Sequence, residues 1–160
     1  MSNRRRFMTL TALPLAGGAL AATATGAADA PKAERFPGDP PEHKVVYQLN
    51  EADNAYIEHI LNSVGAMIGK YQDNVAIAVV VFGPGIHLLA KKPKRPVAAA
   101  LRQRVISQAR DYGVTFIACG NTMKTLGWTA QDIVDVAQVE EVGAAALMEL
   151  QEQGYAYIAW

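Results

Sequence analysis

An unbroken apolar run at residues 75–82, Val-Ala-Ile-Ala-Val-Val-Val-Phe, is the feature that most limits how this chain can fold. The run shows no alternation of polar and apolar residues, so a strand formed here must be covered on both faces. Strands of this kind lie at the centre of parallel sheets, whose crossover connections place helices on either side. The run therefore predicts an α/β fold with a mostly parallel sheet.

Extended and helical patterns alternate along the rest of the chain. Asp53 is placed to cap the first helix, and Gly113 is placed to end the second. The expected strands are 45–49, 75–82, 114–118, 136–139 and 155–159, and the expected helices are 56–71, 97–112, 121–126 and 142–150. This order predicts a three-layer, flavodoxin-like sandwich with about five strands and right-handed crossovers.

Residues 1–30 have the pattern of an export signal. Three arginines at 4–6 are followed by Phe7 and Met8, which resembles the twin-arginine signature, and a mildly apolar stretch continues to about Ala24. Small-residue cleavage patterns occur at 22–24, 26–28 and 28–30. The alternative is an uncleaved anchor, although the segment is short and weakly apolar for a spanning helix. The sequence predicts a periplasmic protein without stable membrane insertion after cleavage.

The remaining chain divides into a linker and one domain. Residues 31–43 are rich in proline and predict an extended tether, and residues 44–160 predict a single compact domain. The formal net charge of the whole chain is zero, and the arginines of the leader leave the rest slightly acidic. This balance argues against general nucleic-acid binding.

The only cysteine, Cys119, lies in the stretch from Val114 to Gly127, where an apolar strand ends in a turn. In open α/β sheets, ligands and reactive groups gather at the carboxyl ends of strands. Asn121 or Thr122 is expected to cap the helix that follows, and the free N–H groups of that helix would favour a thiolate. Lys124 would add positive charge.

A structural reading of Cys119 stays open beside this one. Free cysteines are among the most buried residues, and most of them behave as small apolar groups. A single cysteine excludes an internal disulfide framework and any Cys-x-x-Cys metal or redox pair. In an exported protein, however, a single cysteine without a partner indicates a reactive thiol or an intermolecular pairing, because exported proteins meet oxidising conditions.

Three strand ends are expected to meet around the thiol. Asn50 follows the first strand, Gly83 and Gly85 follow the second, and Gly120 follows the third. Glycine-rich turns of this kind can present N–H groups to an anion. His87 is a candidate proton partner, with a structural histidine as the alternative. No P-loop and no metal-ligand spacing is present, so neither a metal nor a cofactor is expected.

Four segments carry a resemblance to a known family: KVVYQLNEAD, VAIAVVVFGPGIHLL, RDYGVTFIACGNTM and EQGYAYIAW. In this order they resemble the DsrE/DsrF-like family of small sulfur-relay proteins, over essentially the whole of residues 44–160. The resemblance implies a flavodoxin-like fold and association into dimers, trimers or hexamers. It also implies that Cys119 carries sulfur as a persulfide. The export signal departs from the family's largely cytoplasmic members and puts their usual partners in doubt.

The leading hypothesis is therefore a periplasmic sulfur carrier, similar to a sulfurtransferase, that exchanges sulfane sulfur on Cys119 with donor and acceptor thiols. Backbone N–H groups of Gly120 and Asn121 would stabilise the anion. One alternative is a non-catalytic, oligomeric binding module with a structural cysteine. Another is a redox sensor in which Cys119 forms a sulfenic acid or an intersubunit disulfide.

Overall fold

The computed structural model describes residue 36 and residues 38–160 of the chain, so the predicted leader and part of the predicted linker lie outside the described residues. The strands are β1 (His43–Leu49), β2 (Val75–Val81), β3 (Thr115–Cys119), β4 (Ala137–Glu140) and β5 (Ala156–Ile158). The α-helices are α1 (Asn54–Tyr71), α2 (Ala99–Tyr112), α3 (Gly120–Leu126) and α4 (Gly143–Glu152), and the short 3-10 helices are η1 (Gln72–Asn74), η2 (Gly83–Leu88) and η3 (Ala130–Asp132).

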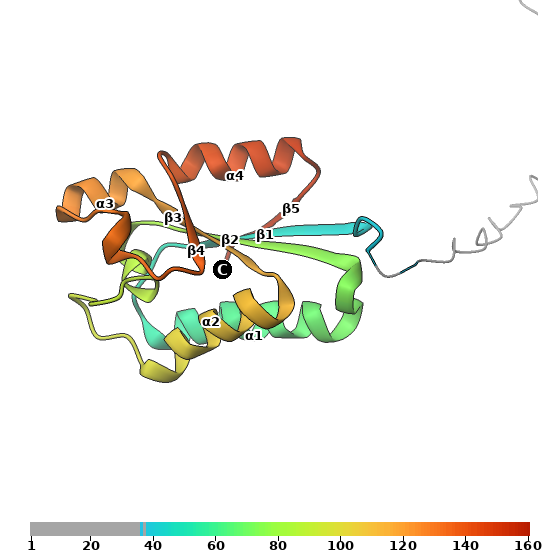
Figure 1. The fold of residues 1–160 in the computed structure, drawn as a ribbon, viewed down its shortest axis with the longest axis horizontal. Coiled ribbons are helices and arrows are strands. Elements are labelled where there is room, and N and C mark those ends of the chain that lie inside the picture. Colours follow the sequence, from blue (N-terminus) through green and yellow to red (C-terminus); the bar gives the residue numbers. More distant parts are fainter. Residues whose placement is uncertain (1–35, 37) are drawn as a thin grey trace, which may run out of the picture. The chain divides into compact units, whose positions relative to one another are not determined.

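The five strands form one sheet in the order β4-β3-β2-β1-β5, and every pair in it is parallel. The apolar run at residues 75–82 forms the central strand β2, and residues 77–81 of this strand are buried. The prediction of a three-layer α/β fold is confirmed, with a sheet that is parallel throughout (Figure 1).

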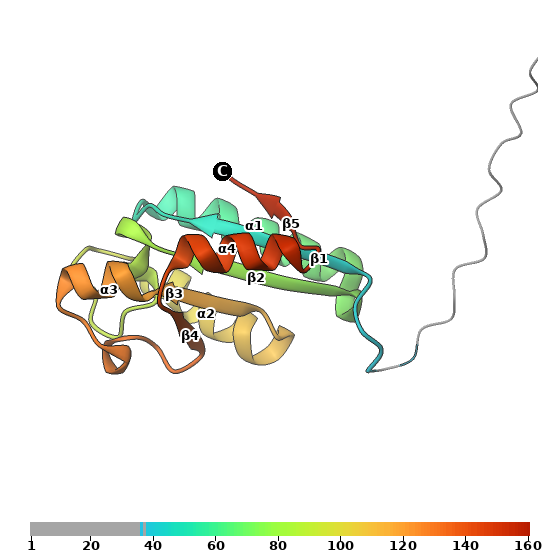
Figure 2. The same ribbon diagram turned by 90° about the horizontal axis from the view of Figure 1, so that it is seen from above.

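Helices cover both faces of the sheet. The helices α1 and α2 lie on one face, and α4 lies on the other (Figures 1 and 2). The connections from β1 to β3 advance across the sheet in one direction, whereas the connection through α4 returns from β4 to β5 at the opposite edge. Because parallel crossovers are right-handed, this reversal of direction places α4 on the opposite face from α1 and α2.

Each face has its own apolar core. Leu49, Val79 and Phe116 belong to the larger core under α1 and α2, together with Ile57 and Ile60 of α1. The smaller core on the α4 side consists of buried aliphatic side chains, namely Val46, Ala78, Val80, Ile117, Ala146 and Leu147. Alternate residues of β2 enter the two cores, as the period of a strand requires.

Several element boundaries differ from those expected. The first strand begins at His43, inside the predicted linker, because His43 pairs in register with Val75 of β2. The helix expected from residue 97 begins at Ala99, since Ala98 is still extended with φ −58° and ψ 133°. Asp53 does cap α1, with its carboxylate accepting the N–H of Tyr56 at 2.9 Å. None of the described helices is long and apolar enough to cross a membrane.

The carboxyl ends of β1 and β2 are packed closely where the chain leaves the sheet. A Cβ atom on Gly85 would lie 2.6 Å from Leu49 Cδ2 and 2.8 Å from the Leu49 carbonyl oxygen. Only glycine fits at this position, so η2 lies directly against the end of β1. This contact positions η2 at the same edge of the sheet, formed by the carboxyl ends of the strands, at which Cys119 lies.

Candidate functional site

Cys119 is the last residue of β3, and it also occupies the position that caps α3. It pairs in register with Glu140 of β4, so the strand continues one residue further than the sequence suggested. The side chain is buried, with only 7% of the residue exposed. The sequence predicted a thiol in a turn after the strand, whereas the structure places it at the buried end of the strand.

Backbone N–H groups from two helix starts surround the sulfur. Gly143, the first residue of α4, donates its N–H to Cys119 Sγ at 3.2 Å. Burial is the largest single influence on the pKa of the Cys119 thiol and raises it, whereas hydrogen bonds from the N–H groups of Thr122 and Gly143 lower it. The Thr122 hydroxyl and the Asn121 N–H add to this effect, so the pKa of Cys119 is lowered from its ordinary value. The site therefore favours the thiolate.

The prediction that Asn121 or Thr122 caps the following helix is wrong. The helix α3 begins at Gly120, its cap is Cys119, and no side chain makes a capping hydrogen bond. Asn121 and Thr122 consequently lie inside the first turn. The Thr122 hydroxyl oxygen accepts the N–H of Gly83 at 3.1 Å, and the Asn121 N–H donates to the Glu141 carbonyl at 2.9 Å.

Gly120 lies where α3 meets the chain after β4. A Cβ atom here would approach the Glu140 carbonyl oxygen to 3.2 Å and Glu141 Cα to 3.2 Å. The glycine thus allows the start of α3 to pack against the segment that leads into α4. This close packing is what brings the two helix starts to the same sulfur.

Lys124 pairs with a carboxylate and makes no contact with the thiol among the described residues. Its ammonium group forms an ion pair with Glu141 Oε1 at 2.9 Å, and both side chains are largely exposed. The same pairing lowers the pKa of the Glu141 carboxyl group. Lys124 therefore joins α3 to the segment before α4, and the pKa of Cys119 is determined by burial and by hydrogen bonds from N–H groups and the Thr122 hydroxyl.

The three strand ends meet as expected. Gly83 has φ +52°, and a Cβ atom on it would lie 3.3 Å from the Asn50 carbonyl oxygen. The Asn50 side chain accepts a hydrogen bond from the Tyr56 hydroxyl at 3.0 Å. Because the N–H of Gly83 reaches Thr122, a continuous series of contacts runs from the end of β1 to the start of α3.

His87 does not contact Cys119 through any of its hydrogen bonds or ring contacts in the described part of the chain. It is 3% exposed, its Nδ1 accepts the N–H of Lys94 at 3.1 Å, and its ring meets Trp128 edge-on at 5.1 Å. Burial lowers the pKa of His87, and the charges of Arg95 and Lys94 lower it further. These contacts fit the structural alternative, in which a neutral His87 holds the basic loop 91–96.

Gly143 is the site residue that the sequence analysis missed. A Cβ atom on it would lie 2.9 Å from Cys119 Cβ and 3.3 Å from Sγ. A glycine near the start of a helix is a weak signal in a sequence, because glycine is common at helix ends. The contact between this glycine and the cysteine depends on the path of the connection through α4, which the sequence alone does not give.

The described residues contain no group of three histidine, cysteine, aspartate or glutamate side chains placed to hold a metal ion.

Solved structures with the same fold have been described from bacteria and archaea. The protein of unknown function MTH1491 from Methanobacterium thermoautotrophicum is 23% identical, with a TM-score of 0.66 over 74% of this chain and 100% of its own. The ychN protein from E. coli is 12% identical, with a TM-score of 0.62 over 74% of this chain and 99% of its own. The protein of unknown function BT1422 from Bacteroides thetaiotaomicron is 17% identical, with a TM-score of 0.51 over 73% and 94%.

These likenesses show the fold, and no curated protein matches the sequence. The family is shown by a separate comparison, in which the model of the DsrE/DsrF-like family matches residues 37–160, the whole of the domain that carries Cys119. The chain therefore belongs to the DsrE/DsrF-like family.

Proposed function

We propose that this protein is a sulfur carrier that holds sulfane sulfur as a persulfide on Cys119. The observation that carries the proposal is the pair of helix starts at the sulfur, where Gly143 donates an N–H at 3.2 Å and Thr122 lowers the thiol pKa. Such donors stabilise a negative charge on sulfur, whether it is a thiolate or a persulfide anion. Membership of the DsrE/DsrF-like family supports a role in sulfur relay.

The proposed reaction is a transfer between sulfur atoms. The Cys119 thiolate attacks the terminal sulfur of a donor persulfide, R–S–SH, and forms Cys–S–SH while the donor leaves as the thiolate RS⁻. An acceptor thiolate then attacks the outer sulfur and releases Cys119 as a thiolate. Each step breaks one S–S bond and forms one, so no external oxidant or reductant is needed.

The low exposure of Cys119 favours a second candidate, the structural cysteine of a binding module. A buried and inert thiol is an ordinary core residue, and this one is 7% exposed. Such a residue needs no N–H donors, however, whereas a persulfide anion does. The two candidates therefore differ in whether the hydrogen bonds around Sγ influence reactivity.

Replacing Thr122 with valine tests this difference. The change removes the hydroxyl that lowers the pKa of Cys119 but keeps the backbone N–H, so we expect the pKa to rise. The measurement is the rate of iodoacetamide alkylation against pH, whose midpoint should move to higher pH in Thr122→Val. The matched control, Thr122→Ser, retains the hydroxyl and should behave like the wild type. An unchanged midpoint in the valine variant would support the structural cysteine.

We further infer that the protein is exported to the periplasm and self-associates there. The arginine-rich leader supports export. Exposed Tyr157 in the edge strand β5, and exposed Trp160 just after this strand, support association into a dimer, trimer or hexamer. Changing the three arginines at 4–6 to lysine should leave the protein in the cytoplasm on cell fractionation. Normal export of that variant would contradict the twin-arginine assignment.

Self-association is tested by light scattering, in which a monomer would contradict it.

A further inference from the structure

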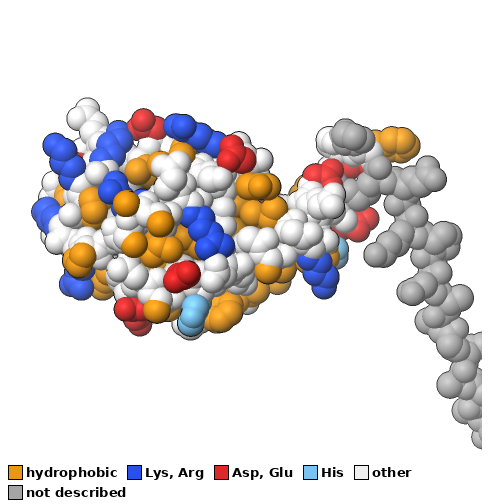
Figure 3. All heavy atoms as spheres, turned by 90° about the horizontal axis from the view of Figure 1, so that it is seen from below, with side chains coloured by type: hydrophobic (Ala, Val, Ile, Leu, Met, Phe, Trp, Pro, Cys, Tyr) orange, Lys and Arg blue, Asp and Glu red, His pale blue; other side chains and the backbone are white. Residues whose placement is uncertain are grey.

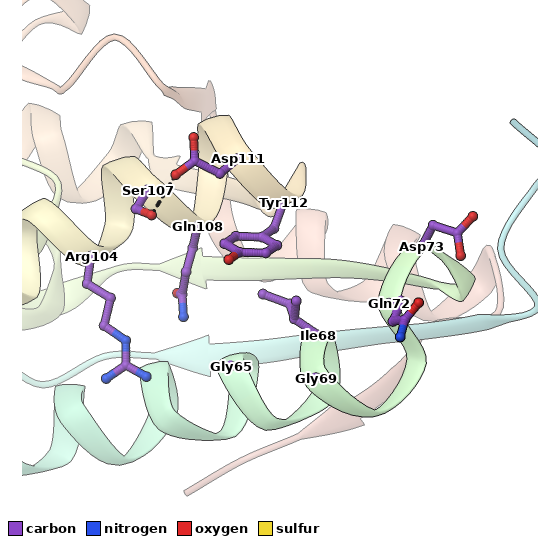
Figure 4. Close-up of a pocket in the computed structure, with 10 residues that line it drawn as sticks. All are labelled: Gly65, Ile68, Gly69, Gln72, Asp73, Arg104, Ser107, Gln108, Asp111 and Tyr112. Carbon is purple, nitrogen blue, oxygen red and sulfur yellow. Dashed lines mark hydrogen bonds between the residues drawn. The ribbon is translucent and has the colours of Figure 1, made fainter. Parts of the chain in front are cut away.

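A groove with a volume of about 730 Å³ lies between α1 and α2, and none of the residues that line it belongs to the site around Cys119. Gly65 and Gly69 form its floor on α1, as Figure 4 shows. Among the described residues, a Cβ atom on Gly69 would meet nothing within 4 Å, whereas one on Gly65 would lie 3.3 Å from Arg104 Nη2 and 3.9 Å from Gln108 Nε2. The floor is therefore open at Gly69 and covered by these two side chains at Gly65. The face formed by these two helices mixes basic, acidic and apolar side chains (Figure 3).

A buried amide without a complete set of partners points into this groove. Gln108 extends from α2 toward α1 (Figure 4), and it is 5% exposed. Its Nε2 donates to the Leu61 carbonyl at 2.9 Å, but its Oε1 accepts no hydrogen bond from the part of the chain that the structure describes. Buried carbonyl oxygens without a donor are rare, so this oxygen is the acceptor in the groove with which a ligand N–H would pair.

The Leu61 carbonyl does not depend on Gln108 alone for a hydrogen bond. The Leu61 carbonyl also accepts a hydrogen bond from Arg104 Nη2 at 2.8 Å. If the terminal amide of Gln108 rotates, the carbonyl keeps this second donor. Because the last torsion of glutamine is broad, a partial rotation toward the groove would bring Oε1 to a ligand N–H in exchange for the contact of Nε2 with Leu61.

Charges of opposite sign lie at different places along the groove. Arg104 binds Asn62 Oδ1 and the Leu61 carbonyl, and neither of these partners is a carboxylate. Asp111 accepts the Ser107 hydroxyl at 2.7 Å, which leaves its negative charge in place. Arg104 and Asp111 are seven positions apart on α2, which corresponds to roughly 10 Å along the helix.

We propose that this groove binds a short zwitterionic peptide of about three residues, whose extended length of roughly 10 Å matches that spacing. The peptide's terminal ammonium group lies at Asp111, and its terminal carboxylate lies at Arg104. The Gln108 amide pairs with a peptide group between them, with Oε1 accepting a peptide N–H. Small apolar side chains pack against Ile68 and Tyr112, which also line the groove. This site is independent of sulfur chemistry at Cys119.

Trialanine is the first probe, titrated into the full chain and followed by the amide signals of the protein in NMR spectra. We expect saturable shifts of residues on α1 and α2, centred on Gly65, Gly69 and Gln108. N-acetyl-trialanine lacks the ammonium group and trialanine amide lacks the carboxylate, so each should bind at least fivefold more weakly. Equal binding of all three peptides, or an absence of shifts in the groove, would overturn the proposal.

Variants of the protein provide the complementary test. Gln108→Leu removes the unpaired oxygen and leaves the Leu61 carbonyl bonded to Arg104, so we expect a folded protein that binds trialanine at least tenfold more weakly. The control Arg110→Met removes a charge from the exposed part of the same helix, outside the groove, and should bind like the wild type. Groove shifts that appear when the protein concentration is raised without peptide, and that trialanine does not change, would mean that a second copy occupies the groove and would overturn the proposal.

Discussion

Replacing Cys119 with serine is expected to abolish sulfur loading while the fold remains intact. After treatment with polysulfide, the wild type should gain the mass of one sulfur atom, and the variant should gain none, because Cys119 is the only cysteine. A serine hydroxyl is close in size to a thiol, so it can accept the N–H of Gly143 as Sγ does. It is not ionised near neutral pH, however, and is therefore a far weaker nucleophile.

The loaded species also separates the candidate functions. Mass spectrometry of the intact chain, with and without a reducing agent, should show an added sulfur that reductant removes. Circular dichroism and light scattering check that the serine variant is folded and assembled like the wild type. A wild type that gains no mass, with a thiol alkylated only above the ordinary cysteine pKa of about 8.5, would rule out the carrier. A thiol that forms sulfenic acid with peroxide but no persulfide with polysulfide would identify the redox sensor.

The sequence predicted the fold well because its signals are local and strong. The buried run of β2 and the apolar spacing of α1 depend only on neighbouring residues, and both elements occur where they were expected. Boundaries were predicted less well where tertiary pairing decides them. The start of β1 at His43 depends on Val75, which lies far along the chain, and no local pattern records that contact.

The site was predicted in part, for a similar reason. The strand ends at Asn50 and Gly83 come together at the carboxyl edge of the sheet, as the topology of a parallel sheet requires. The capping prediction for Asn121 and Thr122 was wrong because β3 continues through Cys119 and leaves no room for a separate cap. Lys124 forms an ion pair with Glu141. This pairing could not be predicted from the residues next to Cys119, because Glu141 belongs to a later segment of the chain.

Replacing Gly143 with alanine is expected to reduce both stability and sulfur loading. The new Cβ would lie 2.9 Å from Cys119 Cβ, a distance that the two backbones can relieve only by moving apart. Overpacking of this kind lowers the free energy of unfolding by about 1–3 kcal/mol. The methyl group would also lie 3.3 Å from Sγ, so we expect it to crowd the sulfur atom that has to be loaded. Urea denaturation and the rate of mass gain in polysulfide measure the two effects.

The matched control is Gly69→Ala, which makes the same change in a helix where the added Cβ meets nothing within 4 Å. Alanine is a better helix former than glycine, so this variant should unfold with a free energy about 0.5–1 kcal/mol higher than the wild type. Its rate of sulfur loading should not change, because Gly69 is in α1, outside the contacts of the thiol. If Gly143→Ala were as stable as Gly69→Ala and loaded sulfur equally fast, the close approach of α4 to Cys119 would have no part in the chemistry. A loss confined to Gly143→Ala would instead show that the start of α4 forms one wall of the sulfur site.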